Sequence, residues 1–205
     1  MRTSTLALAV VVLCGCSSPA PESPTPVGRT AAPIVGGNPS TAAQDSVVFI
    51  QIADGFCSGT LIAPNLVLTA RHCVAPIDES TECGTFSADN DPSTMSIAVG
   101  ANTDQNFPDT IAQGIKVIDD GQSSGCSHDI ALIQLDHDLP GAKVALVRQA
   151  PTTKGELVTA VGFGDDGSGN LTNGRYQRSG IGILGVGPTN FTYTQQDGTT
   201  IRLQK

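Results

Sequence analysis

One histidine stands where a general base would be held in place. The apolar run Leu66-Val67-Leu68 stops at a small residue and delivers His72 directly beside Cys73. Histidine can both accept and release a proton near physiological pH, which suits it to acid–base catalysis. A disulfide at the neighbouring cysteine would fix the backbone next to the imidazole. The sequence therefore predicts that His72, at the end of a strand, is placed for general base chemistry.

The first sixteen residues have the features of an export signal. Arg2 supplies a positive start, and Leu6 to Leu13 form an apolar stretch too short to span a bilayer. The stretch ends in Leu13-Cys14-Gly15-Cys16, which resembles a bacterial lipobox, and Cys16 is then the residue that would carry lipid. The alternative is an ordinary secretory signal with two incidental cysteines. Both interpretations place the protein outside the cytoplasm, either lipid-anchored to the cell envelope, with the outer membrane favoured, or secreted.

Residues 17–33 connect this signal to the rest of the chain. The part from Ser17 to Arg29 is rich in proline and serine and cannot bury enough apolar surface to fold. We interpret residues 17–33 as a linker or propeptide, and residues 34–205 as the folded domain.

Cysteine usage agrees with an exported protein. Four cysteines remain beyond the signal, an even number in an oxidising compartment: Cys57, Cys73, Cys83 and Cys126. Four cysteines allow three connectivities. None stands in a Cys-x-x-Cys spacing, so neither a structural zinc site nor any other metal site is expected. The neighbouring Asp119 and Asp120 are interpreted as a solvated turn.

Composition indicates an all-β domain. The 205 residues include 23 glycines and 13 prolines, and short runs of valine, isoleucine and leucine lie between turn residues. The net charge of −8 argues against a nucleic-acid partner, and no cofactor is expected. The predicted strands are Val47–Ile52, Phe56–Ile62, Leu66–Thr69, Met95–Val99, Ile111–Ile118, Ile130–Leu135, Leu157–Gly164, Tyr176–Val186 and Thr200–Leu203.

Four stretches in order carry a resemblance to a known family. They are Ile34-Val35-Gly36-Gly37, Cys57-Ser58-Gly59-Thr60-Leu61-Ile62, Leu68-Thr69-Ala70-Arg71-His72-Cys73 and Asp129-Ile130-Ala131-Leu132-Ile133. Together they resemble the trypsin-like, chymotrypsin-fold serine endopeptidases over about residues 34–187. The resemblance implies a double Greek-key β-barrel, with His72 as general base and Asp129 as the aspartate that orients the imidazole.

The resemblance also implies the covalent frame of the site. Cys57 and Cys73 match the disulfide that holds the histidine segment, worth about 3 kcal/mol in the chain-entropy model. Cys83 and Cys126 are left to pair with each other. Ile34 matches the N-terminus created by activation, and Phe163 lies in the glycine-bounded turn near the start of the second barrel.

The sequence departs from the family at the nucleophile. The 205 residues contain no Gly-Asp-Ser-Gly-Gly string, which in the family supplies the serine and the oxyanion hole. The nearest imitation, Asp166-Gly167-Ser168-Gly169, reads as a flexible loop. Pro33, rather than a basic residue, precedes Ile34, and Arg71 stands where alanine is common.

The expected fold follows from these departures. A first barrel, about residues 46–138, is complete, and a second, about residues 155–205, is only partly present. An unfinished barrel exposes one apolar face, so Ile181, Ile183, Leu184 and Val186 are expected to have little to pack against.

Three functional hypotheses remain. The first is a trypsin-like serine endopeptidase, monomeric and acting on protein or peptide substrates, whose sequence is C-terminally truncated and inactive as given. The second is a non-catalytic surface binding module, or pseudoprotease. The third is an unstable product without function.

Overall fold

The computed structural model describes residues 34, 36–53, 55–81, 83–101, 112–165, 171–186, 191–194 and 200–203. The chain divides by its internal contacts into two units, Met1–Thr30 and Ala31–Lys205, and all described residues belong to the second. In this part of the chain, no helix has the length and apolar character needed to cross a membrane.

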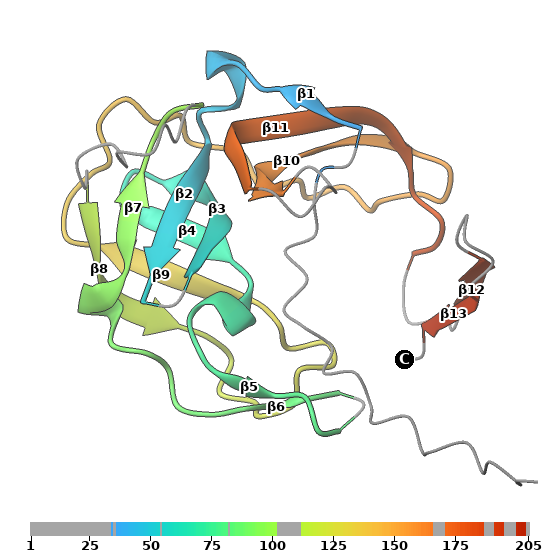
Figure 1. Cartoon of the computed structure of the whole chain (residues 1–205), viewed down its shortest axis with the longest axis horizontal. Coiled ribbons are helices and arrows are strands. Elements are labelled where there is room, and N and C mark those ends of the chain that lie inside the picture. The colour runs from blue at the N-terminus through green and yellow to red at the C-terminus, as the bar shows by residue number, and fades with distance from the viewer. Residues whose placement is uncertain are drawn as a thin grey trace, which may run out of the picture. The chain divides into compact units, whose positions relative to one another are not determined.

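Six antiparallel strands close into a barrel (Figure 1). The ring closes because β2 pairs with β7 as well as with β3. Each strand therefore has a hydrogen-bonded neighbour on both sides. Around the ring the strands are β2 (Val47–Ile52), β3 (Gly55–Ala63), β4 (Leu66–Thr69), β9 (Ala131–Leu135), β8 (Ala112–Ile118) and β7 (Ser96–Ala98).

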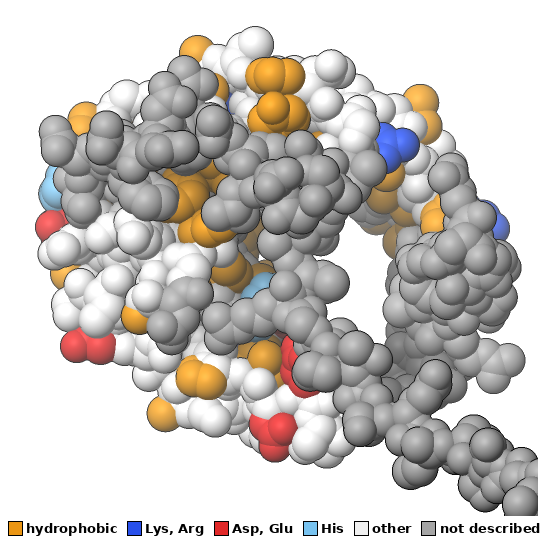
Figure 2. All heavy atoms as spheres, in the orientation of Figure 1, with side chains coloured by type: hydrophobic (Ala, Val, Ile, Leu, Met, Phe, Trp, Pro, Cys, Tyr) orange, Lys and Arg blue, Asp and Glu red, His pale blue; other side chains and the backbone are white. Residues whose placement is uncertain are grey.

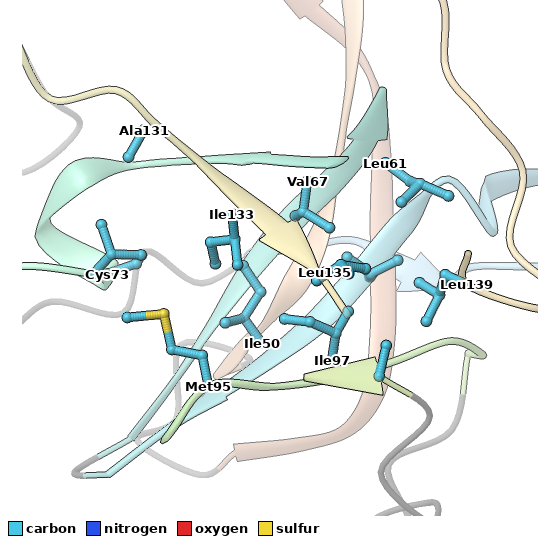
Figure 3. Close-up of a cluster of buried hydrophobic side chains, with 13 residues drawn as sticks. Ile50, Leu61, Val67, Cys73, Met95, Ile97, Ala131, Ile133, Leu135 and Leu139 are labelled. Atoms are coloured by element: carbon cyan, nitrogen blue, oxygen red, sulfur yellow. The ribbon is translucent and has the colours of Figure 1, made fainter. Parts of the chain in front are cut away.

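The barrel interior is filled by alternate residues of these strands, since successive side chains of a strand point to opposite faces. In β9, Ala131, Ile133 and Leu135 are buried, and the residues between them are half-buried. Figure 3 shows side chains from several strands meeting in one cluster. Burying a valine, leucine or isoleucine there contributes about 1.5–3 kcal/mol each. The cluster comprises Val48, Ile50, Leu61, Val67, Cys73, Val74, Met95, Ile97, Ala112, Ala131, Ile133, Leu135 and Leu139.

Gly59 allows two core side chains to approach the backbone of β3. A Cβ atom at this position would lie 2.4 Å from Cγ1 of Val67 and 2.7 Å from Cδ1 of Ile50. Both neighbours are fully buried and have no room to retreat. The glycine of the Cys-Ser-Gly-Thr-Leu-Ile stretch is thus required by packing.

A second sheet has the order β1–β11–β10. It consists of β1 (Asn38–Pro39), β11 (Leu171–Gly182) and β10 (Leu157–Asp165), and all neighbours are antiparallel. Along its end, Leu157, Leu184 and Val186 are exposed, while Ile181 and Ile183 are half-buried. The face drawn in Figure 2 shows apolar side chains at several places and few basic ones.

Two short hairpins complete the described strands. They pair β5 (Ile77–Asp78) with β6 (Thr85–Phe86), and β12 (Phe191–Thr194) with β13 (Thr200–Leu203). Three 3-10 turns lie between strands: η1 (Ala42–Gln44), η2 (Arg71–Cys73) and η3 (Pro92–Thr94).

These elements confirm the expectation of an all-β fold with a closed first barrel and part of a second. The differences are local. The sequence predicted only the second strand of the β12–β13 hairpin, and it treated the β5–β6 region as loop.

A buried arginine joins the second sheet to the barrel. Arg175 of β11 is 1% exposed, and its Nη2 donates to Oδ1 of Asp45 at 2.8 Å. Its Nη1 donates to the carbonyl of Val47 in β2, and its Nε donates to the hydroxyl of Ser40, both at 2.7 Å. A buried charge requires such a set of partners. Arg175 therefore joins β11 to β2 and to the segment from Ser40 to Asp45 that precedes it.

Candidate active site

The histidine segment is a single 3-10 turn that follows β4. In η2, the N–H of Val74 donates to the carbonyl of Arg71 at 2.9 Å, and Cys73 is buried in the barrel core. With Cys73 pointing inward, the neighbouring His72 points outward, and its side chain is 52% exposed. The turn thus presents the imidazole at the barrel surface.

Asp129 holds His72 by two hydrogen bonds. The backbone N–H of His72 donates to Oδ1 of Asp129 at 2.9 Å, and Nδ1 of His72 lies 2.8 Å from Oδ2. An ionised carboxylate only accepts hydrogen bonds, so it fixes the tautomer with hydrogen on Nδ1. The other ring nitrogen, Nε2, is then left with a lone pair that can accept a proton.

The pair is open to water. The side chain of Asp129 is 39% exposed and that of His72 is 52% exposed. Solvent screens the attraction between such groups, so the charge of Asp129 adds little to stability. The two directed hydrogen bonds are the main effect: one holds the backbone of His72, and the other sets the orientation and the tautomer of its ring.

Two disulfides frame this site, and they are the two pairings that the resemblance implies. Cys57 of β3 is bonded to Cys73, next to His72, and the Cα atoms are 6.1 Å apart. Cys83 is bonded to Cys126, three residues before Asp129, with Cα atoms 4.9 Å apart. One bond therefore anchors the histidine turn, and the other anchors the segment that carries the aspartate.

The sulfur atoms of Cys57 and Cys73 lie within 4.8 Å of a ring nitrogen of His72. Zinc and similar metals bind cysteine as thiolate, and these two sulfurs are instead bonded to each other. Among the described residues, this cluster therefore offers a single imidazole ligand and does not suit a metal ion.

Ile34 lies beside the glycine-bounded turn of β10. Its carbonyl accepts a hydrogen bond from Gly37 at 2.9 Å, and a Cβ atom at Gly162 would lie 3.7 Å from its Cδ1. Two other predicted features, the lipidation site Cys16 and the Asp166–Gly169 stretch with Ser168, fall outside the described residues.

In the part of the chain that the structure describes, the hydrogen bonds of His72 go to Asp129, and no serine hydroxyl bonds its ring. The described site therefore contains a histidine and the carboxylate that binds its ring and its backbone.

Sequence reasoning missed the surroundings of Arg71. Asp119, interpreted as part of a solvated turn, is largely buried and forms an ion pair with Arg71 at 2.8 Å. The interpretation failed because a pair of aspartates next to glycine is typical of an exposed turn. The only signal in the sequence was the arginine itself, which stands at an unusual place before the histidine.

Comparison with known proteins identifies the family. The family model described as Trypsin matches residues 34–200, which is most of the chain. The chain belongs to the trypsin family.

Similar proteins agree with this assignment. The CLIP domain-containing serine protease B10 of Anopheles gambiae is 35% identical over 145 residues, which cover 61% of this chain and 36% of that protein. This trypsin-family chain thus spans about a third of the length of that relative.

A solved structure described as "Structure of GrC" has a similar fold, with a TM-score of 0.55 at 20% identity. The likeness covers 71% of this chain and 64% of that one. Together with the closed six-stranded barrel, it confirms the chymotrypsin-like fold class.

Proposed function

We propose that the protein is a serine-type endopeptidase by lineage, in which His72 is the general base and Asp129 orients it. The observation that carries this proposal is the pair of hydrogen bonds that Asp129 accepts, one from the ring Nδ1 of His72 at 2.8 Å and one from its backbone N–H at 2.9 Å. His128 and His137 also pair with a carboxylate through Nδ1, and at His72 the carboxylate binds the backbone N–H as well.

The chemistry assigned to this pair is proton transfer in acyl transfer to a serine. Nε2 of His72 would accept the hydroxyl proton as the serine oxygen attacks a peptide carbonyl, and would then donate it to the leaving amine. Asp129 would stabilise the imidazolium between these two steps. The reaction also needs the serine and backbone N–H donors for the oxyanion.

The 205 residues contain no Gly-Asp-Ser-Gly-Gly string to supply those groups. We therefore propose that this chain by itself does not hydrolyse peptide bonds. Removing a member of the triad leaves catalysis several orders of magnitude lower.

A fluorophosphonate probe tests this proposal, because it labels only an activated serine. We expect neither stoichiometric labelling of the purified chain nor turnover of fluorogenic peptides, with trypsin as positive control. Stoichiometric labelling that the substitution His72→Ala abolishes would overturn the claim of inactivity and support the role of His72. At the DNA level, a Gly-Asp-Ser-Gly-Gly string encoded in any frame beyond Lys205 would supply the missing serine.

A second candidate is a non-catalytic binding module. The exposed apolar residues Leu157, Leu184 and Val186 favour it, since exposed apolar surface can serve to bind a partner. Saturable binding of unfolded casein without cleavage, weakened by Leu184→Ser but unaffected by His72→Ala, would support a binding module. Absence of saturable binding would contradict the binding module.

We also propose that the protein is an exported monomer, with residues 1–16 as lipoprotein signal, 17–33 as linker or propeptide and 34–205 as peptidase domain. Cys16 would carry the lipid that anchors the chain to the envelope. Metabolic labelling with an alkyne fatty acid in a bacterial host should mark the wild-type chain and spare Cys16→Ser. Light scattering should give the mass of one chain.

A further inference from the structure

Two consecutive residues of η2 each bind an aspartate, and both aspartates belong to the connection between β8 and β9. Nη2 of Arg71 lies 2.8 Å from Oδ2 of Asp119, at the start of this connection. His72 binds Asp129, near its end. The histidine turn is thus attached to residues 119–130 at two separate places, one by each residue.

The attachment through Arg71 is buried. The side chains of Arg71 and Asp119 are 8% and 12% exposed. Nη1 of Arg71 also donates to the backbone carbonyl of Gln122, and its Cζ lies 4.7 Å from the ring centroid of the buried Phe86. Charge-assisted hydrogen bonds shielded from water in this way are strong and directional.

The connection between β8 and β9 is braced on its other side as well. The N–H of Phe86 donates to the carbonyl of Ser123 at 2.7 Å, and the next residue, Ser124, forms a β-bridge with Thr85. Cys126 then bonds to Cys83. The segment is therefore held at residues 119, 122, 123, 124 and 126, all within ten residues of Asp129.

Arg71 also balances an excess of negative charge. Oδ1 of Asp89 and Oδ1 of Asp120 each lie 3.9 Å from its guanidinium. Burial, and then the charge of Asp119, raise the pKa of Asp89 in spite of the attraction of Arg71. Without the arginine, the carboxylates of Asp89 and Asp119 would repel each other, and the start of the connection would move.

We propose that Arg71 is a positioning residue for the His72–Asp129 pair. Its guanidinium, bonded to Asp119 and Gln122, fixes the distance between the histidine turn and the segment that carries Asp129. The inference rests on the proposed function, since it assigns Arg71 to the same site. It also gives a physical reason for an arginine at a position where the family commonly has alanine.

The test measures the geometry of the pair directly and does not depend on peptidase activity. The full chain, 15N-labelled with both disulfides formed, is compared with Arg71→Lys and Asp119→Asn by amide hydrogen exchange and by the NMR signal of the Nδ1 proton of His72. Lysine keeps the charge but lacks the fork that bonds Asp119 and Gln122 together. Asparagine keeps the shape of Asp119 but removes its charge.

We expect the amide of His72, which donates to Asp129, to exchange about tenfold faster or more in both variants, through local opening of the turn. The Nδ1 proton signal should broaden or disappear. The amides of Val67 and Ile133, which lie in the β4–β9 ladder, report global stability and should change much less. Matched controls are Arg148→Lys, in an exposed ion pair, and Asp91→Asn, at the cap of η3.

If the His72 amide accelerates only as much as the amides of Val67 and Ile133, Arg71 merely stabilises the barrel and the proposal is wrong. An unchanged Nδ1 signal in both variants would also contradict it. A failure of the proposed function has a different signature, because stoichiometric labelling by the fluorophosphonate probe would overturn the claim of inactivity and leave these exchange rates unaffected.

Discussion

The hydroxyl of Ser58 accepts a hydrogen bond from the backbone N–H of Phe163 at 2.8 Å, and so links β3 of the barrel to β10 of the second sheet. The two residues are 105 positions apart in the sequence. Ser58 follows Cys57 directly, and its own carbonyl accepts a hydrogen bond from the hydroxyl of Thr69 at 3.0 Å. The residue beside the disulfide therefore also connects the two sheets.

Substitution Ser58→Ala should leave the N–H of Phe163 without its partner at a partly buried place. We expect a loss of about 1–3 kcal/mol in the free energy of unfolding. Urea denaturation followed by circular dichroism measures it. Ser179→Ala, which removes an exposed hydroxyl pair with Thr159, is the control and should have a much smaller effect. Equal losses in the two variants would show that the link is not specific.

Arg175→Met should destabilise the protein more than Ser58→Ala does. It leaves Asp45, the hydroxyl of Ser40 and the carbonyl of Val47 without their common donor. Breaking a buried ion pair from one side costs about 3–5 kcal/mol. Thermal unfolding provides the measurement, and Arg148→Met, in an exposed pair, should have little effect. A small loss at Arg175 would mean that water replaces the guanidinium.

The two disulfides should differ in their effect on stability. In the chain-entropy model the Cys57–Cys73 bond, with a separation of 16 residues, contributes about 3 kcal/mol. The Cys83–Cys126 bond, with a separation of 43, contributes about 4 kcal/mol. In urea denaturation, the double variant C83A/C126A should therefore lose more stability than C57A/C73A. The opposite order would show that strain or residual structure, and not loop length, dominates.

Asp89→Asn should stabilise the protein near neutral pH. Burial and the neighbouring charge of Asp119 raise the pKa of Asp89, so the folded state binds this proton more tightly than the unfolded state. The contribution of Asp89 to stability therefore falls as the pH rises from the ordinary pKa of an aspartate, about 3.9, through the raised pKa of Asp89 in the folded state. Above that pH window, the ionised form of Asp89 destabilises the protein.

The urea midpoint of Asp89→Asn should exceed that of the wild type near pH 7, and the difference should vanish at about pH 3, where both side chains are neutral. Asp91→Asn should instead lower the urea midpoint near pH 7. Hydrogen bonds from the hydroxyl and then the N–H of Ser93 lower the pKa of Asp91, so its ionised form is favourable. If Asp89→Asn is less stable than the wild type near pH 7, the attraction of Asp89 to Arg71 outweighs its burial and its repulsion from Asp119.

Much of the barrel could be predicted from the sequence because its strands are dense in valine, leucine and isoleucine. The bounds of β2 and β4 match the predicted ranges, and those of β9 differ by one residue. The two-residue strands β5 and β6 have no such pattern. They exist because the Cys83–Cys126 bond and the loop that follows β8 hold the chain there.

The site was predictable only in part. His72 and Asp129 lie 57 residues apart in the sequence and meet in the structure because β4 pairs with β9. Arg71 and Arg175 could not be recognised as buried, since a charged side chain normally indicates an exposed position. Their burial depends on partners such as Asp119 and Ser40, which are distant in the sequence and have no distinguishing local pattern.

Closure of the six-stranded ring affects how the protein comes apart. A ladder with two neighbours for every strand has no terminal strand from which unzipping can start, so rupture of the ring has to break two seams at once. The turn that carries His72 is continuous with β4 but lies outside the ring, so it can open locally while the ring stays closed. The strand from which the turn departs is thereby held in place up to the temperature at which the barrel itself is lost.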